Sequence, residues 1–345
     1  KGPWMLTLER RLRSPMWLAL AGVAIALGVA AVPLADADGR VDPAGVPQVR
    51  LPLAAAEGEP AASLPQAGAP APASATLLEA GAFGPVPRVA ADGRRPFLAY
   101  ARPFDLDGQR PKVALLVTGL GLQADPTEAA LRLPGAISLH FSAYASDLPS
   151  MLERARSAGH EVLLDLPMEP PDYPASDPGP HALLAGAATG QNLQRLDWLL
   201  ARATGYVGLA GGGSRFATSP QAPPVLDVLT RRGLAMVELG GDDLAAAATA
   251  VGLPYASARA AIDADPSVQA IDYALAGLEA DALRTGTALG VAQGYPVSLE
   301  RLRLWAATLE EKGLALAPVS AVMILRSGPA AGRERNGETP GRSQG

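Results

Sequence analysis

Short runs of apolar residues alternate with amphipathic stretches along most of the chain after residue 112. The apolar runs are about four to eight residues long, as expected for strands that are buried on both faces of a parallel sheet. The amphipathic stretches have the apolar spacing of helices packed against a sheet, and several of them end at a glycine. This pattern predicts strands at 113–117, 137–141, 162–166, 206–209, 234–238, 255–262, 288–292 and 314–319. It predicts helices at 127–132, 148–157, 192–203, 224–232, 243–251, 266–284 and 299–312.

Strands that alternate with helices through short connections form right-handed βαβ units, which place successive strands in a parallel sheet. Seven or eight such units over about two hundred residues fit a distorted parallel (β/α) barrel, a fold of the α/β class. An open, doubly wound sheet is the alternative. We therefore expect one barrel domain at residues 81–325, in which 81–110 form an extended segment packed on the domain surface.

The first 80 residues have a different pattern. Residues 14–35 contain no charged side chain and are long enough to span a bilayer. Arginines precede this run within a basic segment at 1–13 and aspartates follow it, which leaves the N-terminus in the cytoplasm and exports the rest. We expect a retained anchor in the inner membrane with the domain in the periplasm, and a cleaved signal peptide is the alternative. Residues 36–80, rich in Ala and Pro, predict a disordered linker, and the polar tail at 326–345 also predicts disorder.

Composition narrows the chemistry that the domain can perform. The formal net charge is −5, which argues against a nucleic-acid-binding protein. The chain has no cysteine, so disulfides, thiolate metal sites and cysteine nucleophiles are excluded. No serine lies in the sequence context of a nucleophile elbow. Carboxylates, imidazoles and other polar groups must therefore supply any chemistry.

In a parallel α/β barrel, the functional site lies at the carboxyl ends of the strands. Asp165 ends the apolar run at 162–166, and Glu169 follows four residues later, after a proline. Two carboxylates at the end of a buried strand are costly unless they are solvated, paired or bound to a metal, and simple exposure to solvent is the alternative interpretation. His181 lies in the long loop that leaves the same strand, whereas His140 lies within an apolar run and is predicted to be a packed residue. The same rule selects further positions at the ends of other strands, namely Thr118, Gly119, Ser142, Tyr144, Ser214, Arg215, Glu238, Asp263 and Gln293.

Six sequence motifs follow one another in the chain: VALLVTGLGL, LHFSAYASDL, GHEVLLDLPMEPPDYP, DPGPHALL, GYVGLAGGGSRF and GTALGVAQGYPVSLERL. In this order they resemble the divergent polysaccharide deacetylase family, relatives of the carbohydrate esterases that remove N-acetyl groups from chitin-like and peptidoglycan-like polymers. The resemblance covers about residues 81–324, and it implies a distorted β/α barrel that bacteria export. It also implies metal-assisted amide hydrolysis, in which a divalent ion polarises the acetyl carbonyl and the attacking water while acidic residues transfer protons.

The chain departs from the pattern of the typical enzymes at most of the chemically important positions. Those enzymes place an Asp-Asp pair after the first strand, a His-x-x-x-His pair after the third and a further His near the last strands. Here Thr118 and Gly119 stand where the Asp pair is expected, and Asp165 and Glu169 keep the spacing of the His pair. Gln293 stands near the place of the late His. Because such a set is rich in oxygen and poor in imidazole, we expect it to hold Zn²⁺ only weakly.

The sequence therefore predicts that polar residues from several strands converge around one pocket. They are Asp165, Glu169 and His181 as ligands of a divalent metal, Ser214 and Arg215 as glycan-binding residues, and Glu238 and Asp263 as catalytic residues. The base falls to Glu238 or Asp263 because the residues after the first strand carry no acid, and its pKa would need to be raised by burial.

Three functions fit these observations. The first is an exported, membrane-tethered hydrolase that removes acetyl groups from cell-envelope polysaccharide or a peptidoglycan-like glycan. The second is a barrel that has lost catalysis and binds a glycan or a protein of the envelope. A hydrolase of small molecules is a third, and the fold alone does not choose among them.

Overall fold

The computed structural model describes residues 68–212 and 215–327. The predicted anchor at 14–35, most of the predicted linker, nearly all of the tail and Ser214 lie outside the described residues. No helix within the described ranges is both long enough and apolar enough to cross a membrane.

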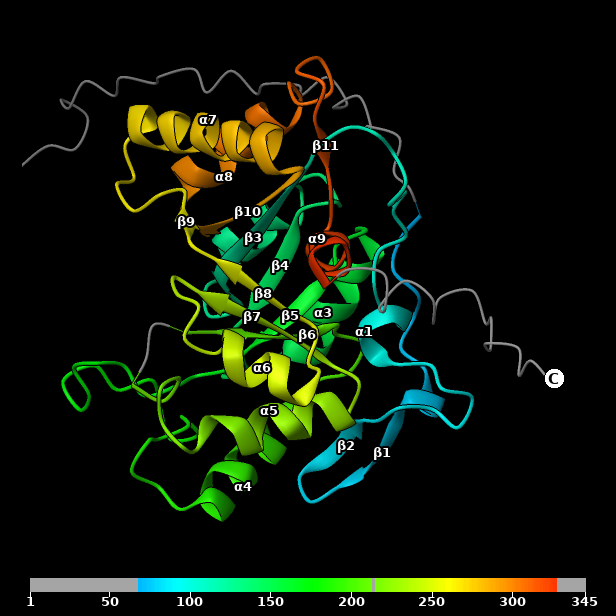
Figure 1. The fold of residues 1–345 in the computed structure, drawn as a ribbon, viewed down its shortest axis with the longest axis vertical. Helices are drawn as coiled ribbons and strands as arrows, with labels where there is room; N and C mark the ends of the chain where they lie inside the picture. Colours follow the sequence, from blue (N-terminus) through cyan, green and yellow to red (C-terminus); the bar gives the residue numbers. More distant parts are fainter. Residues whose placement is uncertain (1–67, 213–214, 328–345) are drawn as a thin grey trace, which may run out of the picture. The chain divides into compact units, whose positions relative to one another are not determined.

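A parallel sheet forms the centre of the domain (Figure 1). Its strands are β3 (Lys112–Leu120), β4 (Ser138–Phe141), β5 (Val162–Asp165), β6 (Gly208–Gly211), β7 (Ala235–Leu239), β8 (Tyr255–Ala258), β9 (Ala260–Ala261), β10 (Thr287–Gln293) and β11 (Ala315–Leu316). The order across the sheet is β8-β7-β6-β5-β4-β3-β10-β9, and β11 pairs with β3 beside this path. Arg259 alone separates β8 from β9, and β9 pairs with β10. The sheet thus returns on itself and nearly closes, which confirms the predicted α/β barrel rather than the open sheet.

Helices follow the strands in the chain and cover the outside of the sheet (Figure 1). They are α2 (Ala124–Ala130), α3 (Leu148–Ser157), α4 (Thr189–Leu200), α5 (Ala222–Arg231), α6 (Ala245–Val251), α7 (Val268–Thr285) and α8 (Pro296–Ala306). Before the barrel, a 3-10 turn (Ala75–Leu77) leads into an antiparallel hairpin of β1 (Leu78–Gly81) and β2 (Gly84–Pro87), and a short helix α1 (Pro96–Ala99) follows. The segment predicted to be extended therefore contains part of a hairpin and a helical turn.

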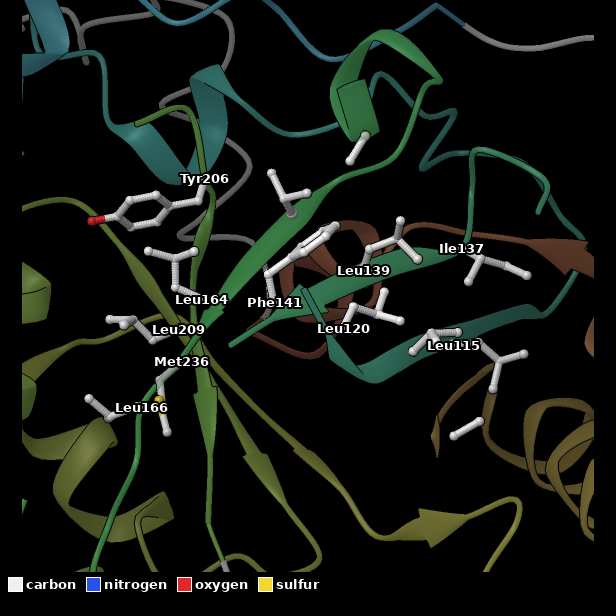
Figure 2. Packing of buried hydrophobic residues seen from close by; sticks show 14 of the residues in the cluster. Leu115, Leu120, Ile137, Leu139, Phe141, Leu164, Leu166, Tyr206, Leu209 and Met236 are labelled. Carbon is white, nitrogen blue, oxygen red and sulfur yellow. The ribbon is translucent and has the colours of Figure 1, made fainter. Parts of the chain in front are cut away.

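Side chains alternate between the two faces of each strand, and this divides the core into two layers. The outer layer lies under the helices and contains large residues, among them Leu139, Phe141 and Leu164 (Figure 2). The inner layer is built largely from small residues, and it includes Ala114, Ala210, Ala235, Ala256 and Ala258. Their small volume leaves room inside the curved sheet for α9 (Val319–Ser327), whose apolar side chains belong to the same layer.

Glu161 fixes α9 to the amino-terminal end of the barrel. Its side chain is fully buried, and the backbone N–H of Ser320 donates to its carboxylate at 3.1 Å. The Ser320 hydroxyl also donates to this carboxylate, and so do the Ser138 hydroxyl at 3.3 Å and the Arg102 backbone N–H at 2.8 Å. These donors satisfy a carboxylate that would otherwise be expensive to bury, although burial still raises the pKa of Glu161.

The prediction was wrong for the segment at 314–319, where only Ala315–Leu316 pair with β3 and a helix begins at Val319. The run VSAVMIL that opens this helix is almost continuously apolar. Periodicity alone does not distinguish a buried strand from a helix that is buried on all sides. Here the helix forms because its position inside the barrel buries nearly its whole circumference.

Candidate functional site

The inner face of the sheet changes from apolar to polar at the carboxyl ends of the strands. Thr118, His140, Asp165 and Gln293 continue the alternation that places Leu116, Leu163 and Leu289 in the inner layer. Parallel pairing sets Gln293 beside Thr118 and His140 beside Leu163, the residue two before Asp165. These four polar residues therefore line the inside of the barrel at the end where sites of this fold occur.

Asp165 and His140 form a close pair within this polar end. The His140 Nε2 atom lies 3.6 Å from the Asp165 Oδ1 atom and 3.2 Å from the carbonyl oxygen of Ala210. His140 is buried, as predicted for a packed histidine, and its Nδ1 atom has no hydrogen-bond partner among the described residues. With Nε2–H donated to Ala210, this Nδ1 atom is left as a buried acceptor.

Burial shifts the titration of both members of this pair. It lowers the pKa of His140 to about 4 and raises the pKa of Asp165 to about 7. The imidazole is therefore uncharged at neutral pH, and the Asp165 carboxyl group is close to its midpoint. A pKa near the working pH suits proton transfer, so the pair can serve as a general acid or base.

Glu169 and Arg215, both selected from the sequence, form an ion pair. The Arg215 guanidinium reaches Glu169 Oε1 at 3.2 Å, with the Arg215 side chain 58% exposed and the Glu169 side chain 7% exposed. The other oxygen of Glu169 accepts a hydrogen bond from the backbone N–H of Ala185 at 2.8 Å. The Glu169 backbone N–H also donates to the carbonyl of Leu183. Glu169 thus anchors the loop after β5 and leaves Arg215 at the surface.

His181 lies in that loop and stacks on an aromatic side chain of α4. The rings of His181 and Trp198 are 3.7 Å apart between centroids and 4° from parallel. The Tyr144 hydroxyl accepts a hydrogen bond from the His181 backbone N–H at 3.1 Å. Partial burial, followed by the nearby charges of Arg195 and Arg202, lowers the pKa of His181 and keeps its ring neutral at pH 7.

Thr118, Gly119, Gln293 and Asp263 meet at the ends of β3 and β10. A Cβ atom on Gly119 would lie 3.0 Å from the Oε1 atom of Gln293, and Gly119 has a positive φ of 75°. The Thr118 hydroxyl donates to the carbonyl of Ala292. Asp263 accepts hydrogen bonds from the Gln293 backbone N–H at 2.8 Å and from the Ser298 hydroxyl at 2.5 Å. Asp263 therefore lies beside the polar end of the barrel and fixes the position of Gln293.

Glu238 points away from the inside of the barrel. The preceding residue, Val237, belongs to the inner layer. Met236, two residues before Glu238 and therefore on the same face, belongs to the outer layer. Both carboxylate oxygens are engaged, with backbone N–H groups of Asp243 and Leu244 each donating at 2.9 Å and the Tyr255 hydroxyl at 2.6 Å. This geometry gives Glu238 a structural role at the start of α6 and does not support the predicted role of a catalytic base.

The residues present do not fit the metal site that the family resemblance implies. The described residues contain no group of three His, Cys, Asp or Glu side chains placed to hold one ion. Asp165, Glu169 and His181 are instead engaged with three different partners, namely His140, Arg215 and Trp198. The predicted three-ligand centre therefore does not form, because the loop after β5 carries Glu169 and His181 away from Asp165 to bonds of their own.

A cavity of about 260 Å³ lies at the opposite, amino-terminal end of the barrel. It is lined by α1, the segment after it and α9, and includes Arg102 and Ser320 of the Glu161 network. None of the predicted site residues lines this cavity.

Trp198 was not among the residues selected from the sequence. A tryptophan in an amphipathic helix has the same pattern as a core residue, so its position gives no indication of a functional role.

Fold and sequence together define the class of protein. The chain belongs to the divergent polysaccharide deacetylase family, which matches residues 115–323, and this confirms the resemblance noted in the motifs. No curated protein matches the chain.

Solved structures include a relative over most of the domain. An uncharacterized protein from Agrobacterium tumefaciens C58 is 34% identical, with a TM-score of 0.67, covering 69% of this chain and 99% of that one. A family 4 carbohydrate esterase from Streptomyces lividans, in complex with acetate, is 14% identical with a TM-score of 0.32, covering 61% of this chain and 91% of the esterase.

Proposed function

We propose that the domain is exported and binds acetylated cell-envelope polysaccharide, or a peptidoglycan-like glycan, at the carboxyl end of its barrel. Family membership supports a carbohydrate ligand, and the position of the polar inner residues supports the place of binding. Arg215 is exposed beside Glu169 and can hold an anionic group of a glycan. The binding role is favoured over metal-assisted deacetylation.

One observation carries this choice. Where the resemblance implies an Asp pair and a late His, the structure brings together Thr118, Gly119 and Gln293. A threonine hydroxyl is not an effective base near neutral pH, and glycine offers no ligand. The Oε1 atom of Gln293 lies 3.0 Å from where a Cβ on Gly119 would be, so an uncharged amide stands at the position where the resemblance implies charged metal ligands.

The pair of Asp165 and His140 favours a second candidate function, a slow hydrolysis of acetyl groups that does not depend on a bound metal. Asp165 titrates near neutral pH and its side chain keeps 28% of its surface exposed to solvent. It can therefore accept a proton from a water molecule that attacks an acetyl carbonyl bound at the polar end.

The test measures binding and chemistry on the same full-length protein. Calorimetric titration with an oligomer of N-acetylglucosamine should show binding, and an acetate-release assay on the same oligomer should show little or no turnover. Titration of Zn²⁺ into wild type and Asp165→Ala should give equally weak binding. Tight Zn²⁺ binding by wild type alone, together with brisk acetate release, would overturn the proposal in favour of a metal-dependent deacetylase.

Export and tethering rest on the uncharged run at 14–35 and the arginines before it. In the producing bacterium, the intact chain should sediment with the inner membrane, and protease added to spheroplasts should digest its domain. Recovery of mature protein from the soluble periplasm, with a new N-terminus near Asp36, would favour a cleaved signal peptide. Protection from protease would contradict export.

A further inference from the structure

The long loop after β5 is fixed by hydrogen bonds from the side chains of α4. Asn192 of α4 accepts from the Leu184 backbone N–H at 3.0 Å and donates to the Leu184 carbonyl at 2.9 Å. Arg195 of the same helix donates to the carbonyl of Ala182 at 3.0 Å. Together with the Glu169 bonds described above, these contacts fix the backbone on both sides of His181.

Tyr144 completes the support of this loop from the side of β4. A Cβ atom on Gly179 would lie 2.8 Å from the Tyr144 ring, so the absence of a side chain there lets the ring lie against the loop backbone. Gly179 has a φ of 105°, which disfavours any other residue at this position. The Asp177 side chain accepts from the Gly179 N–H at 2.9 Å and closes the turn.

The stacked rings are fixed from the other side as well. The guanidinium carbon of Arg202 lies 5.0 Å from the centre of the Trp198 ring. Arg202 itself donates to the carbonyls of Ala143 at 2.8 Å and Ala145 at 2.9 Å, in the loop that follows β4. His181 and Trp198 are both only partly buried. The result is a rigid, half-exposed aromatic surface beside the carboxyl ends of β4 and β5.

We propose that the stacked rings of His181 and Trp198 form a binding platform for a pyranose ring of an acetylated polysaccharide. A pyranose has a face of C–H groups that is apolar and slightly positive, and it packs on the negative face of an aromatic ring. Because the loop is already ordered by its hydrogen bonds, binding costs little conformational entropy. The platform rests on the proposed glycan-binding function, and it names a place on the domain where that glycan makes contact.

The location supports this ligand. Tyr144 lies in the loop that follows β4, and its ring centroid is 6.5 Å from that of His181, so the platform adjoins the carboxyl end of the strand that carries His140. A polysaccharide that lies across the carboxyl ends of the strands can place one unit on the rings and another unit of the same chain at Asp165. One such planar surface is enough to position a sugar chain, because polar groups around the site fix the orientation of the chain.

The test is a calorimetric titration of full-length protein with a tetramer of N-acetylglucosamine. His181→Ala should weaken binding about tenfold, because it removes the ring on which the sugar is proposed to pack. His181→Phe keeps a flat ring at the same place and should bind within about twofold of wild type, which a purely structural role of the imidazole would not explain. Tyr273→Ala removes an 83% exposed aromatic ring from α7 and is the matched control, with unchanged affinity expected.

Thermal unfolding of each variant separates loss of the platform from loss of the fold. Equal affinities of wild type and His181→Ala would overturn the platform and leave the proposed function standing. Loss of binding in both His181→Ala and His181→Phe, with unchanged melting temperatures, would assign the contact to the imidazole nitrogens and overturn ring stacking. Absence of binding by wild type would overturn the proposed function together with the platform.

Discussion

Replacement of Asp165 by asparagine should stabilise the protein at alkaline pH and have no such effect in acid. Asparagine has nearly the same shape as aspartic acid but does not ionise. In the folded protein, burial raises the pKa of Asp165 to about 7 from its ordinary 3.8. The unfolded chain therefore loses this proton at a lower pH than the folded protein does. The stability that the protonated form contributes is present below pH 3.8 and is lost as the pH rises through about 7.

The size of the effect follows from the two pKa values. The difference between 3.8 and about 7 corresponds to about 4 kcal/mol. The Asp165 side chain keeps 28% of its surface exposed, so the carboxylate retains part of its hydration. We therefore expect Asp165→Asn to raise the free energy of unfolding by about 2 kcal/mol at pH 8.

His140 gives the opposite slope and must be separated from Asp165. Burial lowers the pKa of His140 from 6.5 to about 4. The stability associated with its neutral form is present above pH 6.5 and is lost as the pH falls through about 4. In wild type, the effects of Asp165 and His140 on stability oppose each other between about pH 4 and pH 6.5. Asp165→Asn keeps only the effect of His140, which is a loss of stability in acid.

The measurement is urea unfolding followed by circular dichroism in buffers from about pH 4.5 to about 8.5. The difference in unfolding free energy between Asp165→Asn and wild type should grow from about pH 4.5 to about pH 7 and level off above that pH. Asp107→Asn changes an exposed carboxylate and should run parallel to wild type. Infrared difference spectra of wild type against Asp165→Asn at pH 6 should show a protonated carboxyl band. A constant difference in stability across the range, or a carboxylate band alone, would refute the assignment of a buried, protonated Asp165.

Three further outcomes follow from contacts described above. Glu238→Ala should lower the free energy of unfolding by about 2 kcal/mol in urea titrations, because it leaves the buried Leu244 N–H and the part-buried Asp243 N–H without their acceptor; glycan affinity should not change, and a loss of affinity at unchanged stability would contradict a purely structural role of Glu238. Gly208→Ala should lower the melting temperature sharply, since its Cβ would lie 2.2 Å from the carbonyl oxygen of Ala235 on the paired strand; an unchanged melting temperature would contradict the close approach. Gly179→Ala should weaken oligosaccharide binding at nearly constant far-ultraviolet circular dichroism, because it displaces the ring of Tyr144 and the loop behind it.

The alternation of elements was predictable from sequence because it depends on local periodicity. The helix predicted at 148–157 has the bounds observed for α3 (Leu148–Ser157). The predicted strand at 255–262 is real but bends at Arg259 into β8 and β9. The bend allows the barrel to close, and it is determined by the pairing of β9 with β10, which is distant in the sequence. A single-sequence pattern contains no information about such pairing.

The end-of-strand rule placed Asp165 at the polar end of the barrel. Glu169 and Arg215, which the same rule selected, lie in the loops after β5 and β6 and form an ion pair. The rule did not account for Glu238, because it used the end of the strand and ignored the side to which each residue points. One step along a strand reverses that side, and the inner residue at this place is Val237. The stack of His181 on Trp198 was not predictable, since it depends on how a long loop folds back on α4.

The bonds between Glu161 and Ser320 join residues that are 159 positions apart in the chain. In addition, the first barrel strand, β3, pairs with β10, which is made near the end of the domain. The alanine-rich inner face of the sheet therefore lacks part of its cover until α9 has been synthesised. During that interval the strands present unpaired edges and apolar surface to their surroundings. Safe delivery of this domain thus depends on holding the nascent chain apart from its neighbours until its last helix arrives.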